Sequence, residues 1–396
     1  MSIVQIITDN VGLLNMSIGQ WIMILIACLF LYLSVGKKCE PLLLLPLAFG
    51  ILVSNFPIAG LHAYYFNPNE FQEIAGPTLP GLMNVLYNGI RLIIYPPLVF
   101  LCIGTMTDFT PLIASPRLAL IGIGGQLGIF VAMTVSFFVG NALVPYFPGF
   151  DGFTWKEAAS IGIIGSSDGP TSIFAATRLA PELLSAVAIA AFSYMALVPF
   201  IQPPIMRLLT NDKERVIVMP APRKVSQREK ILFPIWMTVL VLALVPQAGI
   251  LISMLMLGNL IRESGVAERF VHTFQNDLIN ILTFVIAFSI GTSATADRFL
   301  TVQTLIILFC GLLAFATGTV GGVLAAKLMC KVTGGKINPL IGNSGVSAMP
   351  MAARISQKLG QQYNPNNFLL MHAMGPIVSS TIGSAIIAGV FIAIFK

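Results

Sequence analysis

Charged side chains are scarce in this chain. Only 16 acidic and 22 basic residues occur among 396, so 10% of the residues are charged, whereas about 25% is usual for soluble domains. A soluble globule of this length needs more polar side chains than that to cover its surface. The hydrophobic share is 56% and the mean hydropathy is +0.87. We therefore expect a polytopic membrane protein, with no stretch outside the membrane segments long enough for a soluble catalytic domain.

The sequence also lacks the common motifs of soluble enzymes. The five cysteines form no CxxC pair, and the three histidines are too scattered for a metal cluster. No phosphate-binding loop, nucleophile elbow or zinc motif occurs. The net charge is +6, but excess Lys and Arg in a membrane protein usually marks cytoplasmic loops, so no nucleic-acid partner is expected. The opening MSIVQIITDN lacks the basic residues of a cleaved signal peptide.

Apolar runs predict the membrane elements. At about 20 residues per span, the length allows roughly ten to twelve of them. Two segments, 158–179 and 337–358, are apolar but interrupted by glycine, proline and polar residues. The uninterrupted runs lie at 16–36, 40–56, 81–105, 117–143, 183–206, 231–246, 249–262, 277–296, 302–330 and 368–395.

The two halves of the chain resemble each other. IGTMTDFTPLI at 103–113 is similar to IGTSATADRFL at 290–300, and GSSDGPTSIFAATR at 165–178 is similar to GNSGVSAMPMAAR at 342–354. PLAFGILVSN at 46–55 is a weaker echo of the MLMLGNLIRES stretch. Such internal similarity indicates that the fold contains a repeated unit. We expect four parts: an N-terminal segment 1–15, a first membrane repeat 16–209, a basic cytoplasmic linker 210–229 and a second membrane repeat 230–396.

Basic residues indicate the orientation of these repeats. The loop 207–230 is rich in Lys and Arg and should be cytoplasmic, whereas the connections 57–80 and 144–153 contain neither and should lie outside. These assignments agree if both interrupted segments enter and return from the same side. Each half then crosses the membrane an odd number of times, about five, so the repeats have inverted topology, as in many secondary transporters. The expected fold is an all-α polytopic membrane protein with two inverted repeats, each with one broken or re-entrant helical segment.

The first interrupted segment contains a single acid, Asp168. It lies in GSSDGPT, where glycine permits non-helical angles and Pro170 removes an amide donor. Two half-helices meeting at an irregular turn are therefore predicted, and such backbone at membrane depth must be buried or line a wet cavity. Free carbonyls, the hydroxyls of Ser166 and Thr171 and the Asp168 carboxylate would form a hard-oxygen site for one monovalent cation. The alternative is that Asp168 is a helix N-cap at an interface, and both can hold together.

The second interrupted segment supplies amides and hydroxyls but no acid. It contains Asn338, Gly342, Asn343 and Ser347. Facing the first segment across a pseudo-twofold axis, it would complete the site with neutral oxygens and leave Asp168 as the only anion. The alternative is a polar helix–helix contact made by small residues.

Three further features have more than one interpretation. Arg354 could hold an anionic group of a substrate or partner, balance Asp168, or snorkel to the cytoplasmic interface. Tyr194 needs a partner if it is buried; it could relay a proton, line the cavity or belong to an interfacial belt. The GxxxG pairs at 124–128 and 318–322 predict close helix packing.

Several long motifs, and their order along the chain, resemble those of one known family. This family is the β subunit of the sodium-pumping, biotin-dependent decarboxylases, which act on oxaloacetate, methylmalonyl-CoA or glutaconyl-CoA. The resemblance runs from about residue 16 to the end of the chain. The motifs are IGIIGSSDGPTSIF, RLAPELL, AFSYMALVPFIQPPIMRLLT, the loop KERVIVM…RKVSQREKILFP, GNLIRESGV, INPLIGNSGVSAMPMAARISQK and NFLLMHAMGP.

The resemblance implies a multi-pass Na⁺ pump in a bacterial cytoplasmic (inner) membrane. A carboxyltransferase α subunit would transfer the carboxyl group to biotin on a carrier domain or subunit. This chain would then receive carboxybiotin, release CO₂ with consumption of a proton, and move Na⁺ outward. The implied partners are those two components, a small membrane γ or δ subunit, membrane lipid and further copies of the β chain.

The resemblance also implies roles for individual residues. Asp168 would bind Na⁺, with Asn338 and Ser347 near the cation path. Tyr194 and Ser347 would relay protons, and Arg354 would face carboxybiotin. The family's ion and proton positions fall on Asp168, Tyr194, Asn338, Gly342, Ser347 and Arg354.

The chain departs from the family pattern near these positions. The family commonly shows GGADGP where this chain has GSSDGP, and SAGVS where it has NSGVS. It often has Asn after the MGP of the last span, where this chain has Ile377. One cation ligand is thereby in doubt, and Asn343 or Ser166 is the candidate replacement.

Two rival functions fit the same sequence. An Na⁺-coupled secondary transporter of similar inverted-repeat fold would take up a solute without a decarboxylase partner. A bare membrane anchor for a soluble enzyme is the blander alternative, but an anchor has no need for two paired irregular segments and an intramembrane acid.

Overall fold

A computed structural model describes residues 16–56 and 82–395, and every regular element within those ranges is helical. The predicted all-α class is therefore confirmed. The expected N-terminal segment 1–15 and the whole connection 57–80 lie outside the described residues. Five helical stretches are long and apolar enough to cross a membrane, and two bent helix pairs raise the number to as many as seven. The five are Ile18–Gly36, Pro116–Tyr146, Glu268–Ser293, Val302–Val332 and Leu370–Ile394.

Two of the predicted spans are bent and not straight. The run expected at 81–105 is divided into two helical pieces, Val85–Arg91 and Tyr95–Met106. The left-handed backbone of Ile93, with φ 59°, lies at this break. The run expected at 183–206 bends by 61° between Met195 and Leu197. Pro199 explains the second bend, because a proline lacks the amide that would bond four residues back and its ring pushes that carbonyl away.

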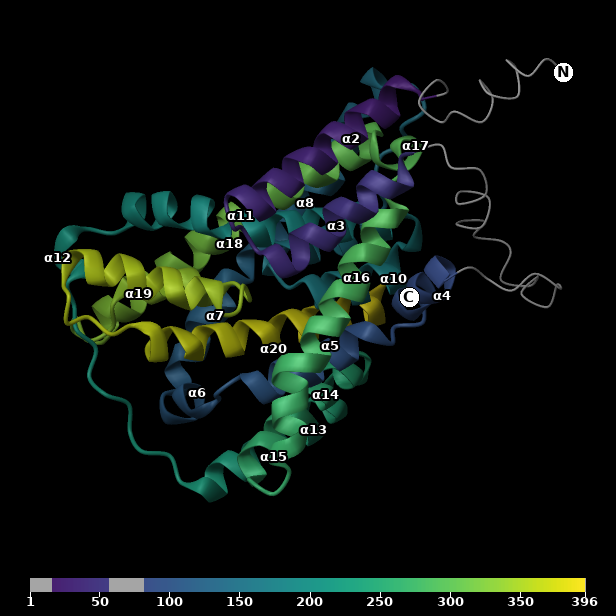
Figure 1. The fold of residues 1–396 in the computed structure, drawn as a ribbon. Helices are drawn as coiled ribbons and strands as arrows, with labels where there is room; N and C mark the ends of the chain where they lie inside the picture. Colours follow the sequence, from purple (N-terminus) through teal and green to yellow (C-terminus); the bar gives the residue numbers. More distant parts are fainter. Residues whose placement is uncertain (1–15, 57–81, 396) are drawn as a thin grey trace, which may run out of the picture. The chain divides into compact units, whose positions relative to one another are not determined.

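The described residues up to Tyr95 and the stretch Asn280–Leu305 form one compact unit. Within it α2 and α3 run side by side (Figure 1). A capping box at Ser17 starts α2, because the Ser17 hydroxyl accepts from the Gln20 amide and the Gln20 side chain accepts from the Ser17 amide. The helices of this unit are α2 (Ile18–Leu31), α3 (Pro41–Ser54), α4 (Leu82–Arg91), α16 (Ile279–Ser293) and α17 (Ala296–Phe299).

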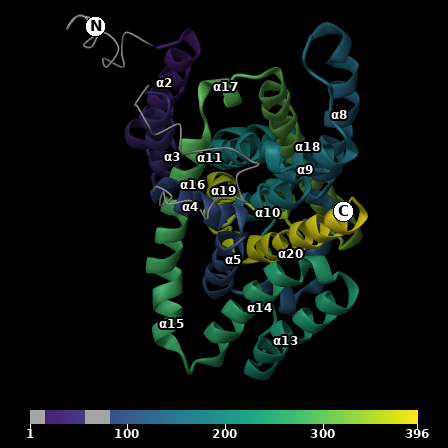
Figure 2. The ribbon, with the colours of Figure 1, turned by 90° about the vertical axis from the view of Figure 1, so that its right-hand side faces the viewer.

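The stretches Pro96–Ile279 and Ile306–Lys396 form the second unit. It contains both interrupted segments, and its α13 and α14 lie side by side (Figure 2). Its helices are α5 (Tyr95–Met106), α6 (Thr110–Ala114), α7 (Ala119–Gly125), α8 (Leu127–Leu143), α9 (Trp155–Gly162), α10 (Gly169–Leu179), α11 (Leu184–Leu209), α12 (Asp212–Arg215), α13 (Gln227–Leu244), α14 (Gly249–Ser264), α15 (Glu268–His272), α18 (Val302–Val332), α19 (Met351–Tyr363) and α20 (Leu370–Ile394). The boundaries of these two units differ from those of the expected repeats 16–209 and 230–396. The division into repeats therefore stays a prediction.

Each unit contains a buried asparagine that binds the backbone where a helix ends. In the first unit, the Asn55 amide donates to the carbonyl of Ala294 at 2.8 Å and accepts from the amide of Ala296 at 2.8 Å. In the second unit, the Asn259 amide donates to the carbonyl of Thr107 at 3.2 Å. Both asparagines satisfy main-chain groups that the end of a helix leaves open.

The basic linker is partly folded onto the second unit. Arg215 is 9% exposed and donates to Thr210 Oγ1, to main-chain carbonyls and to the Tyr363 hydroxyl. Its guanidinium also lies 4.9 Å from the centre of the Tyr363 ring. The first part of the linker is thus anchored, which the prediction of a basic cytoplasmic linker did not specify.

Candidate functional site

The first interrupted segment is two helices joined at an irregular turn, as predicted. A capping box between Thr154 and Glu157 starts α9. The chain then tightens into a 3₁₀ turn over Ile163–Ser166, and Ser167 takes the left-handed conformation with φ 56°. Asp168 caps α10, in which Pro170 occupies the first turn.

Asp168 is buried and receives only neutral hydrogen-bond donors. Its exposed fraction is 5%. The Thr171 amide donates to Oδ1 at 3.2 Å, and the Thr171 hydroxyl donates to Oδ2 at 2.7 Å. The Ser384 hydroxyl of α20 lies 3.1 Å from the same Oδ2. Asp168 is therefore a buried N-cap, which is one of the two interpretations that the sequence left open, and its role as a cation ligand stays a prediction.

No Lys, Arg or His within the described ranges forms an ion pair with Asp168. Those ranges also contain no group of three His, Cys, Asp or Glu side chains that could hold a metal ion. One buried carboxylate among hydroxyl and amide groups provides a single negative charge and hard oxygen ligands. Such a set suits a monovalent alkali ion better than a transition metal.

The second interrupted segment is also non-α-helical where the sequence placed the break. Its 3₁₀ stretch Pro339–Gly345 is capped by Asn338, whose Oδ1 accepts from the Leu340 amide at 2.9 Å. The Asn338 amide nitrogen donates to the carbonyls of Arg215 at 3.0 Å and Ile217 at 2.8 Å. Asn338 thus joins the linker to this segment.

The two interrupted segments meet directly. The Ser347 amide donates to the Ser166 carbonyl at 2.8 Å. The hydroxyls of Ser347 and Ser380 lie 3.0 Å apart. Because Ser384 follows Ser380 by one helical turn and reaches Asp168, α20 carries one serine to each interrupted segment.

Glycines allow the close approach of backbone at this junction. A Cβ on Gly165 would lie 2.5 Å from the carbonyl carbon of Gly128. A Cβ on Gly342 would lie 2.5 Å from the carbonyl oxygen of Gly322. The GxxxG glycines therefore serve close packing, as predicted, and they pack against the interrupted segments themselves.

Two of the predicted cation ligands have protein partners. The Asn343 side chain donates to Gln202 Oε1 at 3.0 Å and to the Ala352 carbonyl at 2.8 Å, and its Oδ1 accepts from the Ser356 hydroxyl. The Ser166 hydroxyl donates to the Ile163 carbonyl at 2.8 Å. Their roles as cation ligands stay predictions, and in this arrangement their hydrogen bonds serve the segments themselves.

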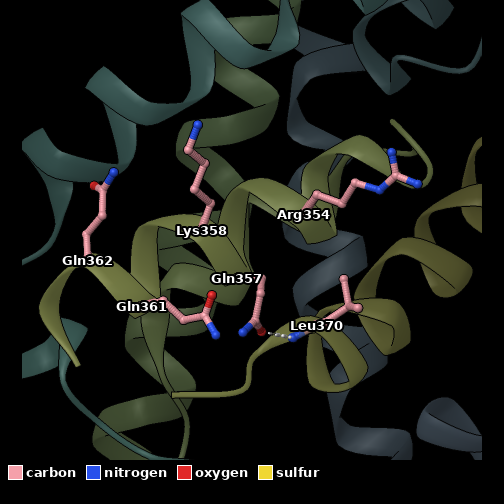
Figure 3. A pocket seen from close by; sticks show the side chains of 6 residues that line it. All are labelled: Arg354, Gln357, Lys358, Gln361, Gln362 and Leu370. Carbon is pink, nitrogen blue, oxygen red and sulfur yellow. Dashed lines mark hydrogen bonds between the residues drawn. The ribbon is translucent and has the colours of Figure 1, made fainter. Parts of the chain in front are cut away.

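Tyr194 and Arg354 lie apart from the Asp168 carboxylate contacts. The Tyr194 hydroxyl donates to the Leu308 carbonyl of α18, so the phenol has the partner that a buried tyrosine needs. Arg354 is exposed on α19, and its guanidinium forms no hydrogen bond or ion pair with the described residues. Arg354 lines an open groove of about 420 Å³, and Figure 3 shows the side chains around it. The groove is lined by Arg354, Gln357, Lys358, Gln361, Gln362 and Leu370.

The contribution of α20 was not evident from the sequence. Ser380 and Ser384 lie in SSTIGSA within an apolar span, where small hydroxyl residues usually bond to the helix's own carbonyls. Their spacing of four places both on one face, which is the only sequence signal for their role. Gln126 was also missed; its Nε2 donates to Ser380 Oγ at 2.8 Å.

Comparison with known proteins agrees with the resemblance found in the motifs. Residues 19–395 match the family described as Na⁺-transporting oxaloacetate decarboxylase beta subunit. The chain is 50% identical over 395 residues to methylmalonyl-CoA decarboxylase subunit beta of Propionigenium modestum, covering 98% of this chain and 97% of that protein. It is 48% identical over 392 residues to glutaconyl-CoA decarboxylase subunit beta of Acidaminococcus fermentans, covering 99% and 97%. It is 48% identical over 425 aligned positions to oxaloacetate decarboxylase beta chain of Klebsiella pneumoniae, covering 97% of each.

Proposed function

Because the chain belongs to the family of Na⁺-transporting oxaloacetate decarboxylase beta subunits, we propose that the junction of its two interrupted segments carries the transported Na⁺. The chain is a membrane-embedded beta subunit of a Na⁺-transporting decarboxylase complex of the oxaloacetate, methylmalonyl-CoA and glutaconyl-CoA group. In this proposal Asp168 is the charged ligand of the ion. The observation that carries it is a 5% exposed carboxylate surrounded by neutral donors.

The hydroxyls around Asp168 can serve two states of the site. The Ser384 hydroxyl has one proton and two acceptors in reach, Asp168 Oδ2 at 3.1 Å and the Thr381 carbonyl at 3.0 Å. Without Na⁺ the proton can stabilise the carboxylate. With Na⁺ it can turn to Thr381, so that its oxygen lone pairs face the ion. Thr171 is the second neutral ligand in this proposal, and Asn338, Gly342, Asn343 and Ser347 remain candidates along the cation path.

Carboxybiotin is the proposed second substrate, delivered by a biotin carrier domain or subunit after carboxylation by an α subunit. Arg354 supports this part of the proposal because its guanidinium is exposed and unpaired within the described residues and lines an open groove. A guanidinium suits a carboxylate because its donors match the two carboxylate oxygens. The groove also contains Lys358 but no acid. A small γ or δ membrane subunit, a bacterial inner-membrane location and further β copies belong to the same proposal.

Ser347 is the favoured proton carrier in this scheme. Decarboxylation of carboxybiotin consumes a proton, which must reach the cytoplasmic reaction site. The Ser347 hydroxyl shares a hydrogen bond with Ser380, and either oxygen can be the donor, so its proton can change direction. Tyr194 is the second candidate, although its hydroxyl is engaged by the Leu308 carbonyl.

Equivalent contacts in the two halves support the proposal of inverted repeats. Gly104 and Gly291 occupy equivalent positions in the sequence repeat. A Cβ on Gly104 would clash with the Leu255 carbonyl oxygen, and a Cβ on Gly291 would clash with that of Leu47. The close approaches of Gly128 to Gly165 and of Gly322 to Gly342 are related in the same way. Transporters with such repeats place the ion at interrupted helices near the midplane.

The proposed coupling is alternating access. Moving one charge against 100 mV costs about 2.3 kcal/mol, so Na⁺ binding by itself cannot drive export. Decarboxylation and proton arrival would shift the protein between states that open to opposite sides, because each state has a different affinity for the ion. In this scheme the part that bears the interrupted segments moves against the rest of the chain.

The decisive experiment compares Asp168→Asn with Asp151→Asn in the complete complex reconstituted in proteoliposomes. Asp151 is an exposed acid outside the site. Asp168→Asn should abolish both ²²Na⁺ uptake driven by decarboxylation and the stimulation of decarboxylation by Na⁺, whereas Asp151→Asn should retain both. Normal pumping by Asp168→Asn would refute the proposal. Solute uptake by the chain alone would instead favour a secondary transporter.

A further inference from the structure

Two buried oxygens have no hydrogen-bond partner among the described residues, one on the neighbour of Asp168 in sequence and one on a side chain that bonds to α20. They are Ser167 Oγ and Gln126 Oε1. Ser167 is 2% exposed and Gln126 is 4% exposed. A buried polar atom without a partner destabilises the folded protein because it has given up its hydrogen bonds to water, so both atoms call for an explanation.

The direction of the Gln126 amide is fixed by its nitrogen. Gln126 lies between α7 and α8, and its Nε2 donates to Ser380 Oγ at 2.8 Å and to the Ser380 carbonyl at 3.2 Å. A carbonyl can only accept, so the amide nitrogen and not the amide oxygen must face it. Oε1 therefore points away from Ser380.

The same amide packs against α20 at Gly383, the residue before Ser384. A Cβ on Gly383 would lie 3.6 Å from Gln126 Nε2 and 3.7 Å from its Cδ. The next residue, Ser384, lies 3.1 Å from Asp168 Oδ2. The Gln126 amide is thus one residue away from the position on α20 that contacts the carboxylate.

Ser167 occupies the turn between the two key contacts of the first interrupted segment. Its preceding neighbour, Ser166, accepts the bond from Ser347, and its following neighbour is Asp168. Its backbone is left-handed, with φ 56°, a conformation that is unfavourable for a residue with a Cβ. A strained residue with an unpartnered buried hydroxyl is costly unless the hydroxyl binds something.

We infer that Gln126 Oε1 and Ser167 Oγ are further ligands of the Na⁺ held by Asp168. The inference rests on the proposed function, since it adds ligands to the same site. Amide and hydroxyl oxygens are hard and neutral, so they suit an alkali ion and leave one carboxylate for one positive charge. They also explain how the site can be completed although Ile377 is apolar and the Asn343 amide is bound by protein groups.

The test measures the Na⁺ concentration that half-saturates decarboxylation by the complete complex. Ser167→Ala and Gln126→Leu should each raise it by about tenfold, the usual scale for groups that support a bound metal. Ser167→Gly should match Ser167→Ala, because both remove the hydroxyl while glycine relieves the left-handed strain. As a binding measurement independent of turnover, the rise in unfolding temperature caused by Na⁺ in place of K⁺ should shrink in all three variants.

Two comparisons separate the ligand role from other causes. Ser136→Ala removes a buried hydroxyl that donates to the Met133 carbonyl at 3.0 Å, and it should keep the wild-type Na⁺ dependence. Ser380→Ala removes one partner of Gln126 but leaves Oε1, so it should shift the Na⁺ dependence less than Gln126→Leu. If Gln126→Leu does not assemble, Gln126→Met is measured in its place, and the two Ser167 variants test the hydroxyl separately.

The inference would be overturned if the Ser167 variants and the assembled Gln126 variant were half-saturated at the same Na⁺ concentration as the wild type. An equal shift in Ser380→Ala and the Gln126 variant would overturn the role of Gln126. These failures differ from failure of the proposed function, which would appear as normal pumping by Asp168→Asn.

Discussion

The Ser384 hydroxyl lies 3.1 Å from Asp168 Oδ2, although 216 residues separate the two in sequence. This contact joins the final helix to the turn of the first interrupted segment. One turn earlier on α20, the Ser380 hydroxyl lies 3.0 Å from that of Ser347. A movement of α20 would therefore change the surroundings of the proposed ion ligand and of the proposed proton carrier together.

Removing the Ser384 hydroxyl should weaken Na⁺ binding. Ser384→Ala deletes an oxygen next to the only buried carboxylate of the site, so half-saturating Na⁺ should rise by about tenfold. Ser379→Ala is the matched control, because the Ser379 hydroxyl bonds to the Ala119 and Pro376 carbonyls. Decarboxylation measured against Na⁺ concentration tests this. Equal behaviour of the two variants would contradict the role assigned to Ser384.

Adding a methyl group at either glycine contact should disturb the junction. In Gly165→Ala and Gly342→Ala the new Cβ would meet main-chain atoms that cannot move aside as a flexible side chain can. Each variant should lose about 1–3 kcal/mol of stability. Thermal unfolding of the detergent-solubilised complex measures this loss. Unchanged unfolding temperatures in both variants would show that the junction accommodates a methyl group at each glycine.

Truncating Asn338 should destabilise the contact between linker and second interrupted segment. Asn338→Ala removes the cap on Leu340 and leaves the carbonyls of Arg215 and Ile217 without this donor. A loss of about 3 kcal/mol is expected from one cap and buried hydrogen bonds. Asn366→Ala, an exposed asparagine in the turn before α20, serves as control in the same unfolding measurement. A similar unfolding temperature for both would argue against this structural role.

The start of α13 should show a defined pH dependence. Hydrogen bonds from the Arg223 guanidinium, with a further one from the Ser226 amide, lower the pKa of Glu229 from 4.5 to about 2. A lowered folded-state pKa stabilises the protein above the unfolded value, and this contribution is lost as the pH falls from about 4.5 toward 2. Arg223→Gln should therefore lower the unfolding temperature slightly at pH 6, with a smaller difference from wild type at pH 3.5. If the difference in unfolding temperature between wild type and Arg223→Gln grew as the pH fell, the prediction would be contradicted.

The class of fold and the position of the breaks were accessible from the sequence. Scarce charge indicated membrane helices, and GSSDGPT indicated a break at Asp168, because glycine and proline act on the backbone locally. The GxxxG glycines were predictable for a similar reason, since a missing side chain directly permits close approach. Such signals need no knowledge of distant partners.

The remaining features depend on partners that one sequence does not reveal. Ser380 and Ser384 are ordinary small residues of an apolar helix until the interrupted segments lie against them. Arg215 contributes to the count of cytoplasmic basic residues, and nothing local indicates that Tyr363 covers it. The bend near Pro199 was missed because the apolar run 183–206 predicted one continuous span. Hydrophobicity alone does not show that a proline removes a backbone hydrogen bond within it.

The separation of Asp168 and Ser384 by 216 residues has a consequence for biosynthesis. Asp168 leaves the ribosome and enters the bilayer well before its hydroxyl donor on α20 has been translated. Until α20 inserts, the nascent protein carries an acid that lacks one of its hydrogen-bond donors. The surroundings of Asp168 are therefore completed late, and a polypeptide released before α20 would lack the hydroxyl that this helix brings to Oδ2.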